Sequence, residues 1–391
     1  MNILIVTGQL ERCGIGVYTQ KLADHLAESG HQVAILTCPT EEFTKPTDSR
    51  NWAHFTLNAT RKLSHADWLP VLAKFRPDVI HIQYPSLHRD AFFLYRETCR
   101  RFLFRKPIVT TFHEKPYQFR SYVLMFTSCH VITVRSVRLA RDWGAYFPCK
   151  KSMVLNATML PEIQLTDDER SQTRRKYGHR SYQNRLTDIK DCNHDDAHGV
   201  CVSPDRRRLI LSFGFLTPHN RTQDILHACN PVTDDLVIAG TCPESIPEHL
   251  KSLHVQCSEA GWNPDEVFRG YVSDDELSKL IASADAIVLP YQSGAGPWNT
   301  SLLAAQQQGT FVLTTTNEQL GMPAVGYHQE TNTFFAPIGS IEKMKDAIAR
   351  YQGHRNPPVS GGRTWQQIAD EHYQIYTRYQ KGRTRFSAAT T

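Results

Sequence analysis

The first residues that could do chemistry are two glycines near the amino terminus. Gly14 and Gly16 follow an apolar run at residues 3–6 and precede apolar residues at helical spacing. A glycine lets a ligand approach the backbone, and the free N–H groups at the start of a helix attract an anion. Thr19 stands where a dinucleotide-binding fingerprint requires glycine or alanine, so the pair is not that fingerprint. The alternative is a tight turn that allows close helix packing.

A histidine and a carboxylate form the second candidate. His113 and Glu114 come directly after an apolar run at residues 108–112, so both should lie at the carboxyl end of a buried strand. An imidazole there can donate a hydrogen bond to a substrate hydroxyl or orient it. The alternative is a surface histidine, one of eighteen in the chain.

The third candidate is Arg221, which follows an apolar run at residues 209–213 and the segment 214–220. Its planar guanidinium could hold a phosphate oxygen through two hydrogen bonds. The alternative is a solvated arginine at the start of a helix.

The loop at residues 290–301 is the most informative segment. A buried strand at residues 286–289 ends in a glycine-rich stretch, and Thr300 or Ser301 then caps a helix. The exposed N–H groups at that helix start form an anion site. The loop is longer than a turn requires, which favours ligand binding.

Alternating apolar runs and helical patterns supply the elements that position these residues. Short apolar runs bounded by proline or glycine predict buried parallel strands, here at residues 3–6, 33–36, 79–82, 108–112, 131–134, 209–214, 236–240, 267–272, 286–290 and 311–313. Apolar spacing predicts helices that begin near Gly16 and at 68–75, 274–283, 300–308, 340–351 and 364–380. The pattern predicts an α/β protein with two doubly wound parallel sheets, whose carboxyl ends face a central cleft.

The distribution of apolar and charged residues divides the chain into four parts. The predicted parts are a first domain at residues 1–161, a charged connection and insertion at 162–207, a second domain at 208–362, and a final helix and tail at 363–391. The charge runs at 167–170 and 206–208 are expected to be solvated.

Composition sets the broad class. The 391 residues suggest two or three domains, and the net charge of +5 permits a phosphate-bearing ligand or a membrane surface without requiring nucleic acid. We expect no transmembrane helix, because no run of 18 apolar residues occurs, and no signal peptide. Ten cysteines without a C-x-x-C pair suggest reduced thiols in a cytoplasmic protein. A zinc site is the less favoured alternative, since its candidate ligands match no standard spacing: Cys192, His194, His198 and Cys201.

Several segments, in order and over nearly the whole chain apart from the insertion, resemble bacterial glycosyltransferases of family 4. These segments are residues 14–18, 77–84, 110–114, 213–221, 236–240, 268–272 and 293–305. The resemblance implies the GT-B fold, with two Rossmann-like domains and a C-terminal helix that returns to the first. It implies a retaining, hexosyl-type transfer from a UDP- or GDP-sugar to an unidentified acceptor hydroxyl, with no metal or other cofactor. The acceptor could be a saccharide, a lipid-linked molecule or a small molecule.

The resemblance also assigns roles to residues. His113 would contact the transferred sugar and Arg221 the leaving phosphate, while Tyr84 and Glu114 would bind the acceptor. Donor binding would fall to a larger group: Gly14, Gly16, Asn220, Tyr271, Val272, Ser293, Gly294, Gly296, Asn299, Thr300 and Ser301.

The chain departs from the family pattern around the donor site. Gly296 and Ala304 stand where many members have two glutamates, Asn220 where they have a lysine, and Phe215 where they have an arginine. Basic residues are also usual where Trp298 and Asn299 stand. One alternative is therefore a catalytically impaired relative that binds nucleotide sugars.

A second alternative is a sugar transferase that acts on modified nucleic acid. The insertion motivates it through basic residues at Arg174, Arg175, Lys176, Arg180, Arg185 and Lys190. A glycoside hydrolase is disfavoured, because it would need two carboxylates flanking the bond and we find no convincing pair.

Overall fold

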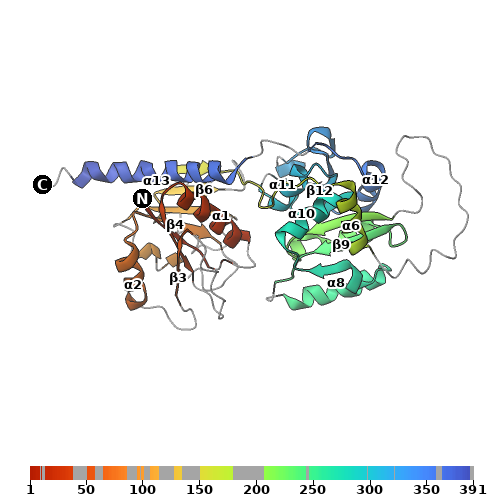
Figure 1. Ribbon diagram of the computed structural model, residues 1–391, viewed down its shortest axis with the longest axis horizontal. Coiled ribbons are helices and arrows are strands. Elements are labelled where there is room, and N and C mark those ends of the chain that lie inside the picture. The colour runs from red at the N-terminus through yellow and green to blue at the C-terminus, as the bar shows by residue number, and fades with distance from the viewer. Residues whose placement is uncertain are drawn as a thin grey trace, which may run out of the picture. The chain divides into compact units, whose positions relative to one another are not determined.

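The protein is described by a computed structural model over residues 1–8, 10, 14–37, 51–57, 65–85, 95–96, 98–100, 106–113, 127–133, 150–178, 207–243, 246–296, 298–320, 322–357 and 363–387. The chain forms two compact units (Figure 1). Unit 1 comprises Met1–Met159 and Arg363–Thr391, and unit 2 comprises Leu160–Gly362. The last helix therefore belongs to the first unit. No helix within the described ranges has the length and apolar character needed to cross a bilayer.

Unit 1 is built on a seven-stranded sheet in the order β3-β2-β1-β4-β5-β6-β7, and its strand pairs are all parallel. The strands are β1 (Asn2–Val6), β2 (Gln32–Thr37), β3 (Ala53–Thr56), β4 (Val79–Tyr84), β5 (Ile108–Phe112), β6 (His130–Thr133) and β7 (Lys150–Met153). Its principal helices are α1 (Gly14–Glu28), α2 (His65–Phe75) and α13 (Trp365–Ser387). The near-continuous apolar runs of β1, β4 and β5 match a sheet that is covered on both faces.

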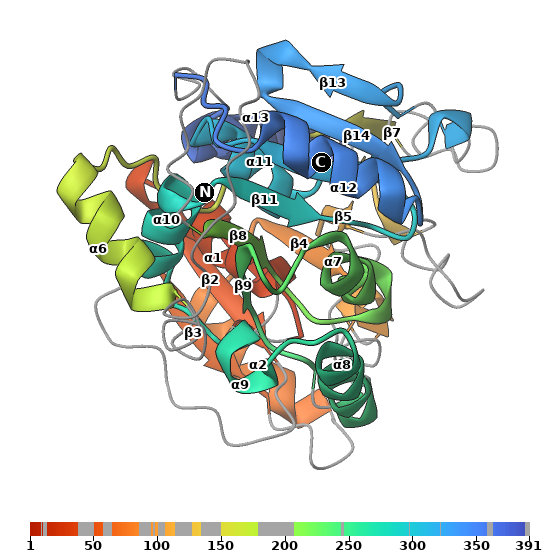
Figure 2. The ribbon, with the colours of Figure 1, turned by 90° about the vertical axis from the view of Figure 1, so that its right-hand side faces the viewer.

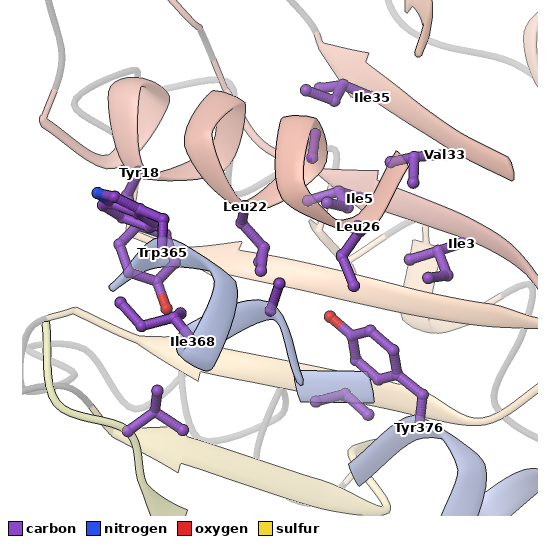
Figure 3. Packing of buried hydrophobic residues seen from close by; sticks show 14 of the residues in the cluster. Ile3, Ile5, Tyr18, Leu22, Leu26, Val33, Ile35, Trp365, Ile368 and Tyr376 are labelled. Atoms are coloured by element: carbon purple, nitrogen blue, oxygen red, sulfur yellow. The ribbon is translucent and has the colours of Figure 1, made fainter. Parts of the chain in front are cut away.

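The C-terminal helix packs on α1 to close one face of this sheet (Figure 3). Tyr18, Leu22 and Leu26 of α1 meet Ile368 and Tyr376 of α13 in one buried cluster. The apolar residues of both helices recur at three- and four-residue spacing, which gives each helix a single buried stripe. Removing α13 would expose the apolar side chains it covers.

Unit 2 carries a second seven-stranded sheet in the order β10-β9-β8-β11-β12-β14-β13. Its strands are β8 (Arg208–Phe213), β9 (Asp234–Ala239), β10 (Phe268–Gly270), β11 (Ala286–Leu289), β12 (Val312–Thr316), β13 (Gly326–His328) and β14 (Thr333–Pro337). Only the β13–β14 pair is antiparallel among these described strands. Its α-helices are α6 (Asp167–Tyr177), α7 (Thr222–Ala228), α8 (Pro247–Glu259), α9 (Pro264–Val267), α10 (Asp274–Ser283), α11 (Thr300–Gln307) and α12 (Ile341–Tyr351). Three short 3₁₀ turns complete it: η4 (Pro218–Asn220), η5 (Glu318–Leu320) and η6 (Gln329–Thr331).

Both sheets contain a switch point, where the strand order reverses. In unit 1 it lies between β1 and β4, and in unit 2 between β8 and β11. Ligands of doubly wound sheets bind outside the carboxyl ends of the strands at such a point. Each unit therefore offers one place where a ligand site is expected.

Part of the predicted insertion is a packed helix of unit 2 instead of a solvated connection. Helix α6 lies beside α10 (Figure 2), and Tyr177 at its end is buried in the core of the unit. A capping box starts the helix, because Thr166 accepts from the Glu169 N–H while the Glu169 carboxylate accepts from Thr166 N–H. Residues 179–206 lie outside the described ranges.

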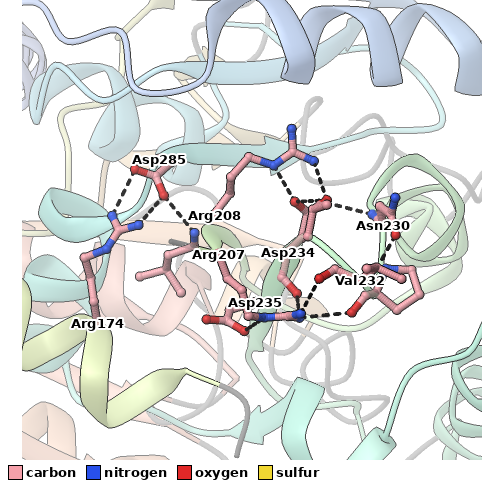
Figure 4. Close-up of polar contacts among 11 residues, drawn as sticks. Arg174, Arg207, Arg208, Asn230, Val232, Asp234, Asp235 and Asp285 are labelled. Carbon is pink, nitrogen blue, oxygen red and sulfur yellow. Dashed lines mark hydrogen bonds and ion pairs between the residues drawn. The ribbon is translucent and has the colours of Figure 1, made fainter. Parts of the chain in front are cut away.

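The second predicted charge run is paired, which corrects the expectation for that run, whereas Asp167, Asp168 and Glu169 of the first run are exposed as expected. Arg207 binds Asp235 and Arg208 binds Asp234 at the start of the sheet (Figure 4). Arg174 of α6 donates to both carboxylate oxygens of Asp285, which also accepts from a backbone N–H. The carboxylate partners are buried or half-buried at the amino ends of β9 and β11. The arginines therefore fix both ends of the segment to the sheet of unit 2.

Candidate functional site

Gly14 and Gly16 lie in the first turn of α1, after β1 and beside the switch point of unit 1. The predicted glycine turn is therefore helical at these two positions. A Cβ on Gly14 would meet no atom within 4 Å, whereas Gly16 is buried. Of the two, Gly14 has the open backbone that a ligand can approach.

His113 follows β5, as predicted, and is held by the neighbouring strand β4. Its backbone N–H donates to the carbonyl oxygen of Tyr84 at 2.7 Å. Its ring Nε2 lies 2.8 Å from the amide oxygen of Gln83, and the edge of its ring meets the Tyr18 ring at 4.7 Å between centroids. Burial, together with nearby His372, lowers the pKa of His113 to about 3, so the imidazole is neutral at physiological pH.

A buried polar network lies behind His113. The hydroxyl of Tyr376 is 2.6 Å from His81 Nδ1, and His81 Nε2 is 2.8 Å from the Thr111 hydroxyl. Burial lowers the pKa of His81 well below its ordinary value, and it lowers the pKa of His372 to about 4. Helix α13 thus supplies two buried polar side chains, Tyr376 and His372, to this side of the sheet.

Sequence reasoning missed this network, although one signal for it is present in β4. Ile80, Ile82 and Tyr84 alternate with His81 and Gln83, which puts both polar side chains on one face of the strand. A buried face with two polar groups requires hydrogen-bond partners. One of these partners, the Tyr376 hydroxyl, comes from α13, nearly three hundred residues later in the sequence.

The two predicted acceptor residues have different outcomes. Tyr84 is 7% exposed, and its ring packs against Phe112 and Tyr95 in the core, with centroid distances of 5.0 and 6.0 Å. Its backbone carbonyl accepts from the His113 N–H, and its part in acceptor binding stays a prediction. Glu114 lies outside the described residues.

Unit 2 has a pocket at its own switch point. It lies beyond the carboxyl ends of β8, β9 and β11, and its empty volume is about 270 Å³ with its open side included. Its lining consists of Ser212, Phe213, Gly214, Phe215, Leu216, Asn220, Thr222, Ile238, Leu289, Pro290 and Tyr291. Asn220 is the predicted donor residue in this lining, and its amide donates to the carbonyl oxygen of Phe215.

Gly214, which lines the pocket, packs closely against a second glycine. Gly240 has φ 158°, and a Cβ on it would come within 1.8 Å of the carbonyl oxygen of Gly214. A Cβ on Gly214 would lie 3.5 Å from Ser301 Oγ. The strand ends of β8 and β9 and the start of α11 therefore approach one another closely beside the pocket.

The start of α11 differs from the prediction in its cap. Asn299 is the N-cap residue, and Thr300 and Ser301 are the first two helical residues. The Asn299 side chain makes no cap bond to the helix, because its amide oxygen accepts from the Gly296 N–H at 2.8 Å. Tyr291 hydrogen-bonds to both Ser301 and Asn299, and its burial raises its pKa. The N–H groups of the first turn are left available to an anion.

The glycine-rich loop before α11 is tightly packed. Gly294 has φ 80°, and a Cβ on it would lie 2.5 Å from Met322 Sδ. A Cβ on Gly296 would lie 2.2 to 2.6 Å from the Trp298 ring. Gly296 is therefore required by the indole ring that covers it, while Ser293 in the same loop is exposed.

Arg221 does not line the pocket. Its Nε and one terminal nitrogen bind the two carboxylate oxygens of Asp224 at 2.6 and 3.0 Å. The guanidinium thus makes two hydrogen bonds to the buried Asp224 carboxylate, and its predicted contact with a phosphate stays a prediction. Nearby on the same unit, Tyr271 is 76% exposed after β10, and Val272 packs against the core.

Comparison with known proteins identifies both units. The description Glycosyltransferase Family 4 matches residues 13–154, and Glycosyl transferases group 1 matches residues 207–353. The chain belongs to the family 4 glycosyltransferases. An uncharacterized glycosyltransferase of Methanocaldococcus jannaschii is 24% identical over 93% of this chain and 94% of its own length.

Solved structures identify the fold of this glycosyltransferase. HepE of Anabaena, solved with UDP and glucose, gives a TM-score of 0.64 at 14% identity and covers 100% of both chains. Sucrose-phosphate synthase of Thermosynechococcus elongatus gives 0.66 at 14% identity and covers 99% of both. The predicted GT-B fold with two parallel-sheet α/β domains is confirmed.

Proposed function

We propose that this glycosyltransferase moves a hexosyl group from a UDP- or GDP-sugar to an acceptor hydroxyl, with retention at the anomeric carbon and without a metal cofactor. The pocket at the switch point of unit 2 carries the proposal, because it lies beside Gly214, Ser301 and the uncapped start of α11. HepE, which shares the fold, was solved with UDP and glucose. We expect the reaction to take place in the cytoplasm.

The chemistry requires stabilisation of a leaving diphosphate. Its charge grows as the glycosidic bond breaks, and the N–H groups at the start of α11 are aligned to meet that charge. In a same-face retaining route the leaving phosphate takes the proton of the acceptor hydroxyl. The lowered pKa of His113 keeps its imidazole neutral at the working pH. This neutral imidazole hydrogen-bonds the transferred sugar.

The start of α11 can be tested with an acidic substitution. Ser301→Asp places a carboxylate where a helix start favours negative charge, so folding is retained while a diphosphate is repelled. We expect UDP or GDP at a hundred times its Kd to stabilise the parent chain by about 2.7 kcal/mol, and the variant to lose that gain. Ser340→Asp, which places the same charge at the N-cap of α12, is the matched control.

Thermal shift with UDP, GDP, UDP-glucose and GDP-mannose is the measurement, followed by assay of donor hydrolysis. A melting temperature unmoved by any of these compounds would contradict the proposal. His113→Ala should lower turnover about 10²-fold, whereas His25→Ala, on the far turn of α1, should leave it unchanged.

A second candidate, binding without turnover, is favoured by one observation. Arg221 pairs with Asp224, and the position of the usual lysine is held by Asn220, so no cationic side chain lines the described part of the pocket. This candidate predicts a thermal shift with UDP or GDP but no hydrolysis of any nucleotide sugar. The nucleic-acid alternative is weakened, because Arg174 and Lys176 are engaged in ion pairs.

A further inference from the structure

We propose that Gln83 is a positioning residue for the transfer reaction: its side-chain amide fixes His113 in the tautomer that carries hydrogen on Nε2 and leaves Nδ1 to accept a hydrogen bond from a substrate hydroxyl. The inference rests on the proposed function for its catalytic consequence. Its structural part, the tautomer, stands independently of any substrate.

The contact between the two side chains defines the tautomer. His113 Nε2 lies 2.8 Å from Gln83 Oε1, and an amide oxygen only accepts. Nε2 therefore carries the hydrogen, and in a neutral imidazole the other nitrogen then holds the lone pair. Within the described residues, no protein group donates to His113 Nδ1.

The backbone fixes the distance between these residues. Gln83 and Thr111 are register partners in the parallel pair β4–β5. The His113 N–H donates to the Tyr84 carbonyl immediately beyond that pair, so the ladder continues to the site. The Gln83 side chain is fully buried, which leaves it little freedom to turn away.

The other end of the amide is also held. Gln83 Nε2 lies 3.4 Å from Nδ1 and 3.3 Å from Nε2 of His81, so the amide nitrogen faces the His81 ring and the oxygen faces His113. His81 is anchored in turn by the Tyr376 hydroxyl of α13 and the Thr111 hydroxyl of β5. The orientation of the amide thus depends on contacts from two strands and the C-terminal helix.

No charged group in contact with His113 determines which of its ring nitrogens carries the hydrogen, within the described residues. The titratable groups packed around His113 are all buried: Tyr18 from α1, His81 from β4, and His372 and Tyr376 from α13. Arg363 and Glu371 act on Tyr18 from a distance, and Arg363 also acts on His372. His113 is neutral among them, so the hydrogen bond to Gln83, and not a charge, selects which nitrogen accepts.

Two substitutions separate this role from simple packing. Gln83→Leu removes the acceptor, so both tautomers become populated and kcat/KM should fall about tenfold, the loss expected for one hydrogen bond. Gln83→Glu keeps an acceptor for Nε2–H but adds a carboxylate, which raises the pKa of His113 and should introduce a new acidic limb in the pH profile of kcat. Ser152→Ala, which removes a hydroxyl partner of His130 in the same sheet, is the control.

The decisive measurement is the ¹⁵N spectrum of histidine-labelled protein without substrate, with the His113 signals assigned by their loss in His113→Asn. We expect a pyrrole-type Nε2 and a pyridine-type Nδ1 in the parent chain and in the Ser152→Ala control, and a mixture in Gln83→Leu. A pyrrole-type Nδ1 in the parent chain, or an unchanged tautomer and kcat/KM in Gln83→Leu, would overturn the proposal. The expected tautomer in a chain that turns over no donor would contradict the proposed function alone.

Discussion

Arg221 adopts a left-handed backbone conformation, with φ 41° and ψ 42°, between η4 and α7. Such a conformation costs a non-glycine residue about 1 kcal/mol or more. Asp224, 6% exposed at its side chain, offsets this cost by holding the guanidinium with two hydrogen bonds. At this scale Arg221 is a structural residue whose charge satisfies a buried carboxylate.

Arg221→Ala should therefore act on stability. It leaves Asp224 without its cation, and we expect unit 2 to lose on the order of 2 kcal/mol of unfolding free energy. Urea unfolding measures the loss, and the double variant with Asp224→Asn should recover part of it. A normal stability combined with a large rise in the KM for the donor would instead support a phosphate contact by Arg221.

Gly296 supports a second prediction for a single residue. Gly296→Ala places a methyl group against the Trp298 ring, so we expect a loss of about 1–3 kcal/mol from overpacking. In Gly296→Ala/Trp298→Ala the clash is absent, and stability should return toward that of Trp298→Ala alone. A melting temperature of Gly296→Ala equal to that of the parent would show that the indole ring moves freely.

At the scale of the elements, helix α6 is attached to unit 2 by two ion pairs as well as by the buried Tyr177 side chain. The Arg174 side chain is 12% exposed and binds Asp285, whereas Lys176 of the same helix is 62% exposed and binds Glu276. A half-buried bidentate pair and an exposed single pair on one helix provide a direct comparison.

Arg174→Ala should destabilise unit 2 by about 3 kcal/mol, because it removes the guanidinium that pairs with the half-buried Asp285 carboxylate. Lys176→Ala should cost about 0.5 kcal/mol or less, as exposed pairs do. The unfolding free energies of both variants are measured by chemical unfolding at low and moderate salt. Only the loss in Lys176→Ala should depend on salt. Equal losses in the two variants would mean that the Asp285 pair is worth no more than a surface pair.

The sequence predicts those elements of the fold that carry a clear apolar pattern. Strands β1, β4, β5, β8 and β11 were predicted, because buried parallel strands are continuous apolar runs. Edge strands β3 and β7 and the helix α6 have no such pattern: β7 reads Lys-Lys-Ser-Met, and α6 contains few apolar residues. The site divides similarly. His113 and the α11 loop directly follow strands, whereas Tyr376, the hydrogen-bond partner of His81, lies on a helix remote in sequence.

At the scale of the whole molecule, the folded state of unit 1 should lose stability in acid while staying fully stable at neutral pH. His81, His113 and His372 have depressed pKa values when folded, against an ordinary value of 6.5. Below pH 6.5 the unfolded chain therefore binds protons that the folded chain does not, so stability is full above 6.5 and falls as the pH drops toward 4 and 3.

For His372 alone, the shift to about 4 corresponds to a loss of on the order of 3 kcal/mol. Thermal unfolding followed through the fluorescence of Trp365 and Trp52, which both lie in unit 1, should shift downward from pH 7 to 4.5. His372→Gln should show a shallower decline. A midpoint that stays level over this range would mean that these imidazoles take up protons in the folded chain over the same pH range as in the unfolded chain.

The position of α13 also governs the order of assembly during synthesis. A leading domain ordinarily folds as soon as it leaves the ribosome, but here the side chains that cover Leu22 and Leu26 are made after the whole of unit 2. At a translation rate of about 5–20 residues per second, the apolar face of α1 stays exposed on the nascent chain for on the order of ten seconds or more. Chaperone capture of ribosome-bound chains should therefore persist until residues near 376 emerge.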